Sequence, residues 1–161
     1  DKDLYRLRDD QLAILRRRQF GFVFQSYNLV RELTGMENIL LPLMLDKRTP
    51  DEAYLNRLID ILGIDSRRNH LPSAMSGGQQ QRFAIARALA NKPEILFADE
   101  PTGNLDGQTG RMVLELLREL NRELGITLVL VTHDLGVAEQ AQRVIHLTDG
   151  KIARDSGGVQ P

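Results

Sequence analysis

ILFADEPT, at residues 95–102, is an apolar run that ends in two adjacent carboxylates, Asp99 and Glu100. A run of this kind predicts a central strand of a parallel sheet, covered by helices on both faces. Parallel sheets bind ligands at the carboxyl ends of their strands, where Asp99 is suited to hold Mg²⁺ directly or through water. Glu100 is then suited to polarise the water that attacks a γ-phosphate, as general base or positioning group. A solvated strand end or a helix cap is the alternative, and the pair alone does not decide between them.

The residues that follow predict a second parallel strand. Apolar residues recur at helical spacing between residues 112 and 124, and another apolar run spans residues 126–131. A strand, a helix and a strand in this order imply a right-handed crossover and a parallel sheet. The second run leads to His133, which is placed to contact a γ-phosphate or to hold the catalytic geometry. A single histidine is more often structural, and His70 and His146 have no such context, so neither is assigned a function.

MSGGQQQR, at residues 75–82, predicts the beginning of another helix. Ser76 is a typical N-cap, and the unpaired amides of a helix start bind phosphate oxygens. Gly77 and Gly78 have no side chain, which permits close approach of the backbone to such a group. An ordinary N-cap with a flexible lead-in is the commoner meaning of an isolated SGG.

The first part of the chain predicts a helix and then a strand. Asp9 or Asp10 is expected to cap the helix, with three arginines, residues 16–18, in its last turn, where cations complement the helix dipole. Aromatic and β-branched residues at positions 20–24 predict the strand, which places Gln25 on the loop that follows.

The remaining segments predict helices and a hairpin. Residues 36–71 follow helical periodicity, and Gly63 is a plausible helix end within them. Residues 144–153 predict a terminal hairpin with a turn at Asp149 and Gly150.

Composition restricts the function classes. The 161 residues are enough for one domain with a hydrophobic core, and 21 basic against 22 acidic residues give a net charge of -1, so no global field recruits nucleic acid. The absence of cysteine excludes disulfides, zinc–thiolate sites and a cysteine nucleophile. No apolar run approaches the ~20 residues of a membrane span, and the charged start is unlike a signal peptide. A first residue other than Met leads us to expect a trimmed or partial chain.

The motifs, in their order and strand contexts, resemble the ABC ATPase family over essentially residues 1–157. The resemblance identifies Gln25 as the Q-loop, residues 76–79 as the signature motif, residues 99–100 as the Walker B motif, His133 as the switch histidine and residues 104–106 as the D-loop. It implies ATP and Mg²⁺ as cofactors, with Asp99 and Gln25 at the metal and Glu100 and His133 in catalysis. It also implies that nucleotide held by a second subunit contacts Ser76, Gly77, Gly78 and Gln79, and that Asp106 couples the two sites of a head-to-tail homodimer.

The same resemblance implies an α/β P-loop NTPase core with an inserted helical subdomain. Residues 1–161 would form one ABC ATPase domain, in which residues 29–90 are the helical subdomain and residues 1–28 and 91–161 are the α/β core. Such a protein is a cytoplasmic motor, peripheral on the inner face of the membrane, that drives a transmembrane permease. Finer features resemble the branch that serves lipoprotein release, macrolide and antimicrobial-peptide export, and cell division.

A phosphate loop, G-x-x-x-x-G-K followed by Ser or Thr, does not occur in these 161 residues. In the family, this loop, its strand and an adenine-stacking aromatic precede the position of residue 1. The sequence is therefore expected to be either a fragment of a gene for the whole ATPase or a natural remnant, and the retained later motifs favour the fragment. Either way, the chain alone is expected not to hydrolyse ATP at a useful rate and to be less stable, because a central strand and its helix are gone.

Two other function classes stay open at this point. A non-transport ABC ATPase acting on DNA or ribosomes would carry a long coiled coil or a second cassette, and neither is present. A binding module that recognises a membrane partner without hydrolysing ATP is the second alternative.

Overall fold

A three-stranded parallel sheet, in the order β1-β2-β3, is the frame of the fold. The computed structural model describes residues 4–157. The strands are β1 (Phe20–Phe24), β2 (Ile95–Asp99) and β3 (Thr127–Val131). The register pairs Phe24 with Asp99 and Asp99 with Val131, so the three strands end at one edge of the sheet. The predicted crossover and the α/β class are confirmed.

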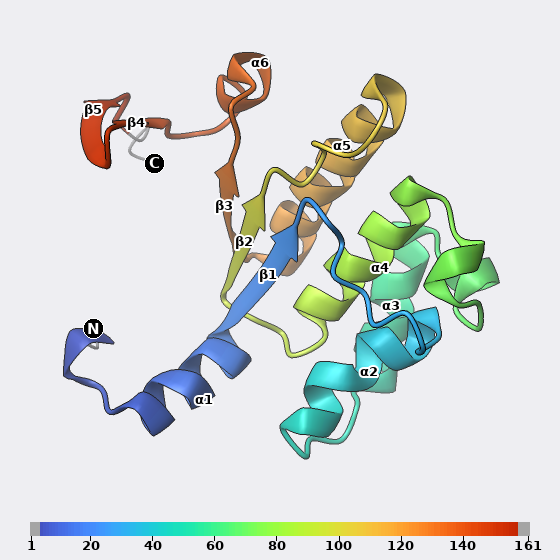
Figure 1. Ribbon diagram of the computed structural model, residues 1–161. Helices are drawn as coiled ribbons and strands as arrows, with labels where there is room; N and C mark the ends of the chain where they lie inside the picture. The colour runs from blue at the N-terminus through green and yellow to red at the C-terminus, as the bar shows by residue number, and fades with distance from the viewer. Residues whose placement is uncertain (1–3, 158–161) are drawn as a thin grey trace.

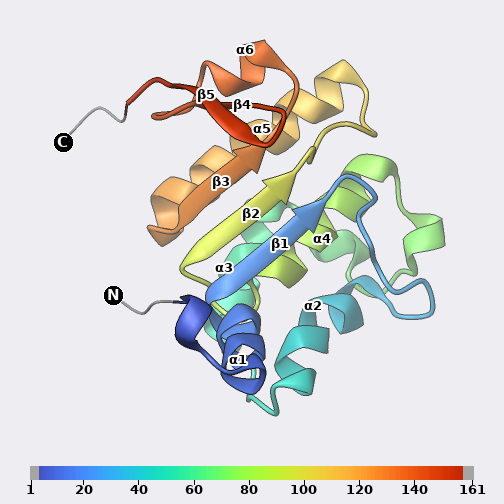
Figure 2. The same ribbon diagram turned by 60° about the vertical axis from the view of Figure 1, so that its left-hand side comes forward.

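Helices cover one face of this sheet (Figures 1 and 2). In chain order the helices and the remaining strands are η1 (Leu4–Arg6), α1 (Asp9–Gln19), α2 (Gly35–Leu45), α3 (Glu52–Leu62), η2 (Asp65–Arg67), η3 (Pro72–Ala74), α4 (Gly77–Leu89), α5 (Gly107–Leu124), α6 (Leu135–Ala138), β4 (Ile145–Thr148) and β5 (Lys151–Asp155). Strands β4 and β5 form the predicted antiparallel hairpin. No helix within residues 4–157 is both long enough and apolar enough to cross a bilayer.

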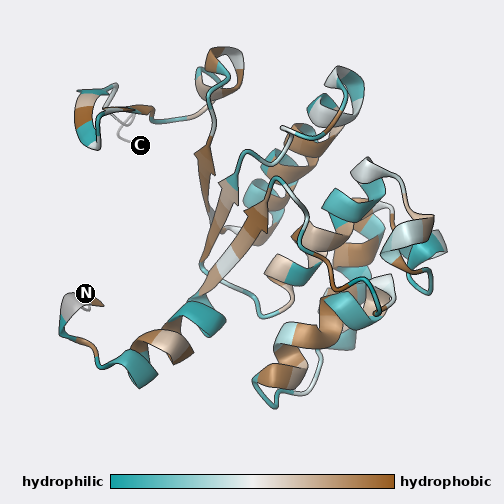
Figure 3. Ribbon diagram, viewed as in Figure 1, coloured by the Kyte–Doolittle hydropathy of each residue, from teal (hydrophilic) through white to brown (hydrophobic). Residues whose placement is uncertain are grey.

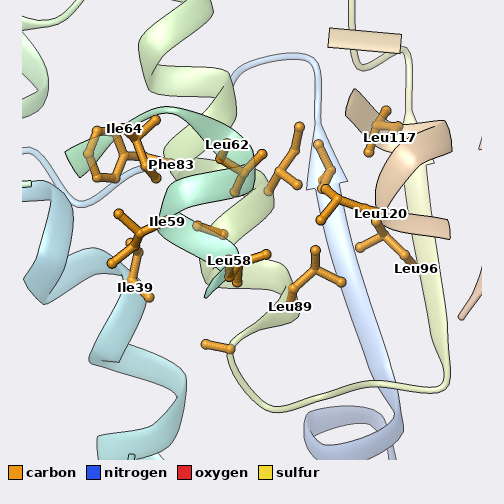
Figure 4. Close-up of a cluster of buried hydrophobic side chains, with 14 of the residues drawn as sticks. Ile39, Leu58, Ile59, Leu62, Ile64, Phe83, Leu89, Leu96, Leu117 and Leu120 are labelled. Carbon is orange, nitrogen blue, oxygen red and sulfur yellow. The ribbon is translucent and has the colours of Figure 1, made fainter. Parts of the chain in front are cut away.

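The hydrophobic core lies between the sheet and helices α3, α4 and α5. The core includes Leu96 of β2, Leu117 and Leu120 of α5, Phe83 of α4 and Ile59 of α3 (Figure 4). Helix α3 shows the expected periodicity and ends at Gly63, which has a left-handed φ of 60°. These elements form because their apolar positions recur once per helical turn and face the same side.

The opposite face of the sheet is open among the described residues. Burial alternates along β1 and β2, and β3 has no fully buried residue. Phe22 and Phe97 stack with ring centroids 5.4 Å apart on this face, and Val131 is 54% exposed. Figure 3 shows that the strands of this sheet consist mostly of apolar residues. The prediction that β2 and β3 are covered on both faces is wrong for residues 4–157, because helices lie on one side only.

Helix α1 also differs from expectation at its start. Arg8 occupies the N-cap. Asp9 and Asp10 lie in the first turn, where their negative charges interact favourably with the positive end of the helix dipole. The predicted cap at Asp9 or Asp10 is therefore wrong. At the other end, Arg17 and Arg18 contact Asp46 at 2.8 and 2.9 Å, which ties α1 to the end of α2.

Candidate functional site

The carboxyl edge of the sheet gathers the residues that the sequence singled out. Gln25 follows β1, Asp99 ends β2, Glu100 follows it, and His133 comes two residues after β3. Because the strands are parallel and in register, these residues leave the sheet at the same edge. Residues from three separate segments therefore lie at one edge of the sheet, as predicted, and Glu100 and His133 are in contact.

Glu100 is held in one orientation by the segment after β3. Its Oε1 accepts a hydrogen bond from the backbone N–H of His133 at 2.8 Å and lies 2.7 Å from His133 Nδ1. Thr132 donates to Oε2 over a longer distance of 3.4 Å. The backbone of Glu100 is left-handed, with a φ of 44°, which is strained for a residue with a side chain and is typical of functional positions.

Gln25 is joined to Asn104 by a reciprocal pair of amide contacts. Gln25 Nε2 donates to Asn104 Oδ1, and Asn104 Nδ2 donates to the carbonyl of Gln25, both at 3.1 Å. The absent side chain of Gly103 leaves room for Gln25, because a Cβ there would lie 2.6 Å from Gln25 Nε2. The loop after β1 and the loop after Glu100 are thus in direct contact.

The beginning of α4 lies beside these loops. Ser76 is the N-cap, and Gln79 completes a capping box by accepting from the Ser76 N–H at 2.9 Å. A Cβ at Gly77 would lie 2.8 Å from the hydroxyl of Tyr27, and one at Gly78 would lie 2.5 Å from Thr109 Cγ2. A side chain at either position would therefore displace a neighbour within this chain, irrespective of any role in phosphate binding.

Asp106 is the N-cap of α5, and its side chain is held by the first turn of that helix. Its carboxylate accepts from the backbone N–H groups of Gln108 and Thr109 and from the Thr109 hydroxyl, at 3.0, 3.0 and 2.6 Å. These hydrogen bonds, led by the Thr109 hydroxyl, lower the pKa of the Asp106 carboxyl. The segment from Glu100 to Asp106 is thus fixed at both ends.

Sequence reasoning missed the residues that hold the Gln25 loop. Tyr27 and Asn28 both have a positive φ, 60° and 52°, which is an uncommon pair of left-handed residues. Arg87 of α4 donates to both of their carbonyl groups, and the Tyr27 hydroxyl donates to the Asn104 carbonyl at 3.4 Å. An arginine in the last turn of α4 gives no sequence signal for this role.

The acidic residues at this edge suit a cation that takes most of its ligands from water and substrate rather than from the protein. Among the described residues, no group of three His, Cys, Asp or Glu side chains is arranged to hold a metal ion. Asp99 is exposed at the end of β2. Mg²⁺ binds through one or two carboxylates together with water and substrate phosphates, and a single exposed carboxylate beside Gln25 fits that mode.

Known proteins match both the sequence and the fold. The ABC transporter family model matches residues 3–103. The chain is 49% identical over 156 residues to the macrolide export ATP-binding/permease protein MacB 1 of Aeromonas hydrophila, with 96% of this chain and 24% of that protein covered. It is 46% identical over 155 residues to the lipoprotein-releasing system ATP-binding protein LolD 1 of Rhodopseudomonas palustris, with 94% and 69% covered.

Solved structures of MJ0796, an ABC transporter cassette of Methanocaldococcus jannaschii, share the fold. The dimeric structure has a TM-score of 0.79 and 45% identity, and the match covers 96% of this chain and 69% of that one. A second dimeric structure, of a post-hydrolysis state bound to ADP and Pi, matches with the same TM-score of 0.79. The chain thus spans about a quarter of the MacB protein and about two thirds of the shorter relatives, with 66% of the curated MJ0796 sequence covered.

Proposed function

This chain belongs to the ABC transporter family, and from that premise we propose that it is the ATP-binding and ATP-hydrolysing motor of a transporter. The observation that carries the proposal is the contact of Glu100 with His133 at the edge of the sheet where Gln25 and Asp99 also lie. Strands β2 and β3 deliver an acidic residue and a histidine to one point, which is the arrangement that activation of a water molecule needs.

Glu100 is the group that accepts the proton of the attacking water. Its carboxylate is 22% exposed, so it reaches the surface without being free to rotate into solvent. His133 donates from its backbone and, through Nδ1, from its ring, because a carboxylate only accepts hydrogen bonds. The ring nitrogen Nε2 is then left to face a bound phosphate.

ATP and Mg²⁺ are the proposed cofactors. Asp99, with Gln25, would hold Mg²⁺, which would supply positive charge to neutralise the phosphoryl oxygens. The fit rests on an exposed carboxylate at the end of β2 and on the Gln25 amide, whose position Asn104 fixes. The post-hydrolysis state of the MJ0796 cassette, bound to ADP and Pi, supports the same ligand class for this chain.

Dimerisation completes the site in this proposal. Ser76, Gly77, Gly78 and Gln79 begin α4, where free amides and the positive end of the helix dipole favour phosphate oxygens of nucleotide held by a second subunit. Asp106 lies on the neighbouring loop and links the two sites. The dimeric MJ0796 cassette supports this assembly.

The membrane partner is a permease for export or extraction. We assign residues 29–90 as a helical subdomain, with residues 1–28 and 91–161 as the α/β core. A groove of about 530 Å³ between α1, β1, α2 and α4 is lined by Pro42, Leu45 and Arg87 among others, and it suits a short helix of that partner. The protein would then lie peripherally on the inner face of the membrane, as expected for a motor that works beside a permease.

ATP hydrolysis tests the proposal. We would compare this chain with the full natural polypeptide, including any residues encoded before Asp1, and with Glu100→Gln in both. The full polypeptide is expected to hydrolyse ATP, and Glu100→Gln to reduce kcat by at least about 100-fold with binding retained, because the amide does not accept a proton. Hydrolysis that survives Glu100→Gln, or its absence from the full polypeptide, would contradict the proposal.

A further inference from the structure

Gln81 of α4 is the buried polar residue beneath the site. Its side chain is fully buried, with 0% exposure. The amide nitrogen donates to the carbonyl of Pro101 at 2.6 Å and to the carbonyl of Phe24 at 3.4 Å. Phe24 immediately precedes Gln25, and Pro101 immediately follows Glu100. One nitrogen atom therefore contacts both segments at the point where each leaves the sheet.

The oxygen atom of the Gln81 amide is in an energetically unfavourable position. Gln81 Oε1 is buried and has no hydrogen-bond donor among the described residues. A buried acceptor without a partner opposes folding, whereas an apolar side chain of similar shape at the same place is close to neutral. Stability alone therefore does not explain why residue 81 is a glutamine. We attribute the glutamine to its two hydrogen bonds with backbone carbonyl groups.

The position of Gln81 on α4 links it to the phosphate-binding end of that helix. Helix α4 begins at Gly77, and Gln81 lies about one turn further along. A displacement of α4 along its axis would therefore move the Gln25 loop and the Glu100 loop together. The paired strands end at Phe24 and Asp99. Beyond this pair, side chains connect the two loops: Gln81 in the protein interior and Asn104 at the surface.

We propose that Gln81 is a positioning residue that fixes the spacing between the Gln25 loop and the Glu100 loop and couples both to the start of α4. Its contribution to catalysis rests on the proposed function, whereas its effect on the loops does not. It acts through the backbone of Phe24 and Pro101 and touches no reacting atom.

Hydrogen exchange of the 161-residue chain tests the effect on the loops. Gln81→Met and Gln81→Leu both replace the amide with an apolar side chain of similar volume, and Gln80→Met is the control, because the Gln80 side chain donates to the Met75 carbonyl just before its own helix. The backbone amides of residues 25–28, 100 and 102–104 are expected to exchange at least about tenfold faster in the Gln81 variants and at the wild-type rate in the control. The Tm is expected to change by no more than about 4 °C.

Kinetics of the full natural polypeptide test the catalytic consequence. Gln81→Met is expected to lower kcat about tenfold or more while KM for ATP stays within about threefold, because the loops are misplaced only for the chemical step. Unchanged loop exchange would overturn the proposal, as would a large fall in Tm with uniformly faster exchange, which marks a merely structural residue. If the wild type does not hydrolyse ATP, the proposed function fails, and loop exchange still decides the role of Gln81.

Discussion

Glu100 Oε1 lies 2.7 Å from His133 Nδ1 and also accepts the backbone N–H of the same residue at 2.8 Å. One carboxylate oxygen thus makes both short contacts, while Oε2 has only the 3.4 Å contact from Thr132. A hydrogen bond of that length is weak, so Oε2 is the oxygen that is free to accept from a water molecule. In the proposed function, the contacts with His133 therefore leave Oε2 of Glu100 to accept the proton of the attacking water.

Substitution of His133 separates this role from a direct contact with phosphate. His133→Ala removes the ring donor and keeps the backbone donor, so kcat of the full natural polypeptide is expected to fall about 10- to 100-fold. Asn places an N–H close to the position of Nδ1 but has nothing at Nε2. Steady-state kinetics should therefore show His133→Asn several-fold faster than His133→Ala. Equal rates for the two variants would mean that Nε2, and not the contact with Glu100, carries the effect.

Asn104 is expected to control the order of the Gln25 loop. Asn104→Ala removes both amide contacts with Gln25, whereas Asn104→Asp keeps only the acceptor. The backbone order parameter of Gln25, measured by ¹⁵N NMR relaxation, is expected to fall below about 0.6 in the alanine variant and to take an intermediate value in the aspartate variant. A rigid Gln25 in Asn104→Ala would show that the other contacts of the loop, led by those of Arg87 with Tyr27 and Asn28, hold it without the Asn104 side chain.

Local patterns predicted the elements that place the site. The apolar run before Asp99, the aromatic run before Gln25 and the serine before Gly77 each form the strand or helix start that was expected. These signals depend on neighbours in sequence, because strand alternation, helix periodicity and capping are local properties. The placement of Gln25, Glu100 and His133 at one edge of the sheet followed from the parallel order of the strands alone.

Contacts between distant segments could not be predicted in the same way. The contacts of Gln81 with Phe24 and Pro101 span 57 and 20 residues, and those of Arg18 with Asp46 span 28. A glutamine within a polar run, or an arginine at a helix end, looks solvated in the sequence. The uncovered face of the sheet was also missed, because an apolar strand does not indicate how many layers pack against it.

Asp46 is expected to make stability depend on pH. Its side chain is buried, and the hydrogen bond from Arg18, with the charge of Arg17, lowers the pKa of the Asp46 carboxyl. A lowered pKa in the folded state stabilises the protein above the unfolded pKa of about 3.9 and loses that effect as the pH falls. In thermal unfolding near pH 7, the wild type should have a higher Tm than Asp46→Asn. The difference between the two Tm values should become smaller as the pH falls towards about 3. A gap that is constant with pH would assign the effect to packing alone.

Gly78 should be required for the contact between α4 and α5, irrespective of nucleotide. A Cβ at Gly78 would lie 2.5 Å from Thr109 Cγ2, so Gly78→Ala is expected to lower the free energy of unfolding by about 1–3 kcal/mol through overpacking. Thr109→Ser removes that methyl group and keeps the hydroxyl that bonds Asp106 at 2.6 Å. The double variant should therefore recover most of the loss in urea unfolding, which gives a coupling energy between the two sites.

Gly107→Ala is the matched control for this cycle. Gly107 is also near the start of a helix, and the nearest atom to its Cβ would be Arg111 Nη1 at 3.7 Å, which is ordinary contact. Its free energy of unfolding is expected to stay within about 0.5 kcal/mol of wild type. If Gly78→Ala is equally mild, α4 and α5 can separate at little cost, and the glycine is explained by close approach of a phosphate rather than by packing within the chain. A large loss that Thr109→Ser relieves would instead show that the helix start is shaped first by its neighbour α5.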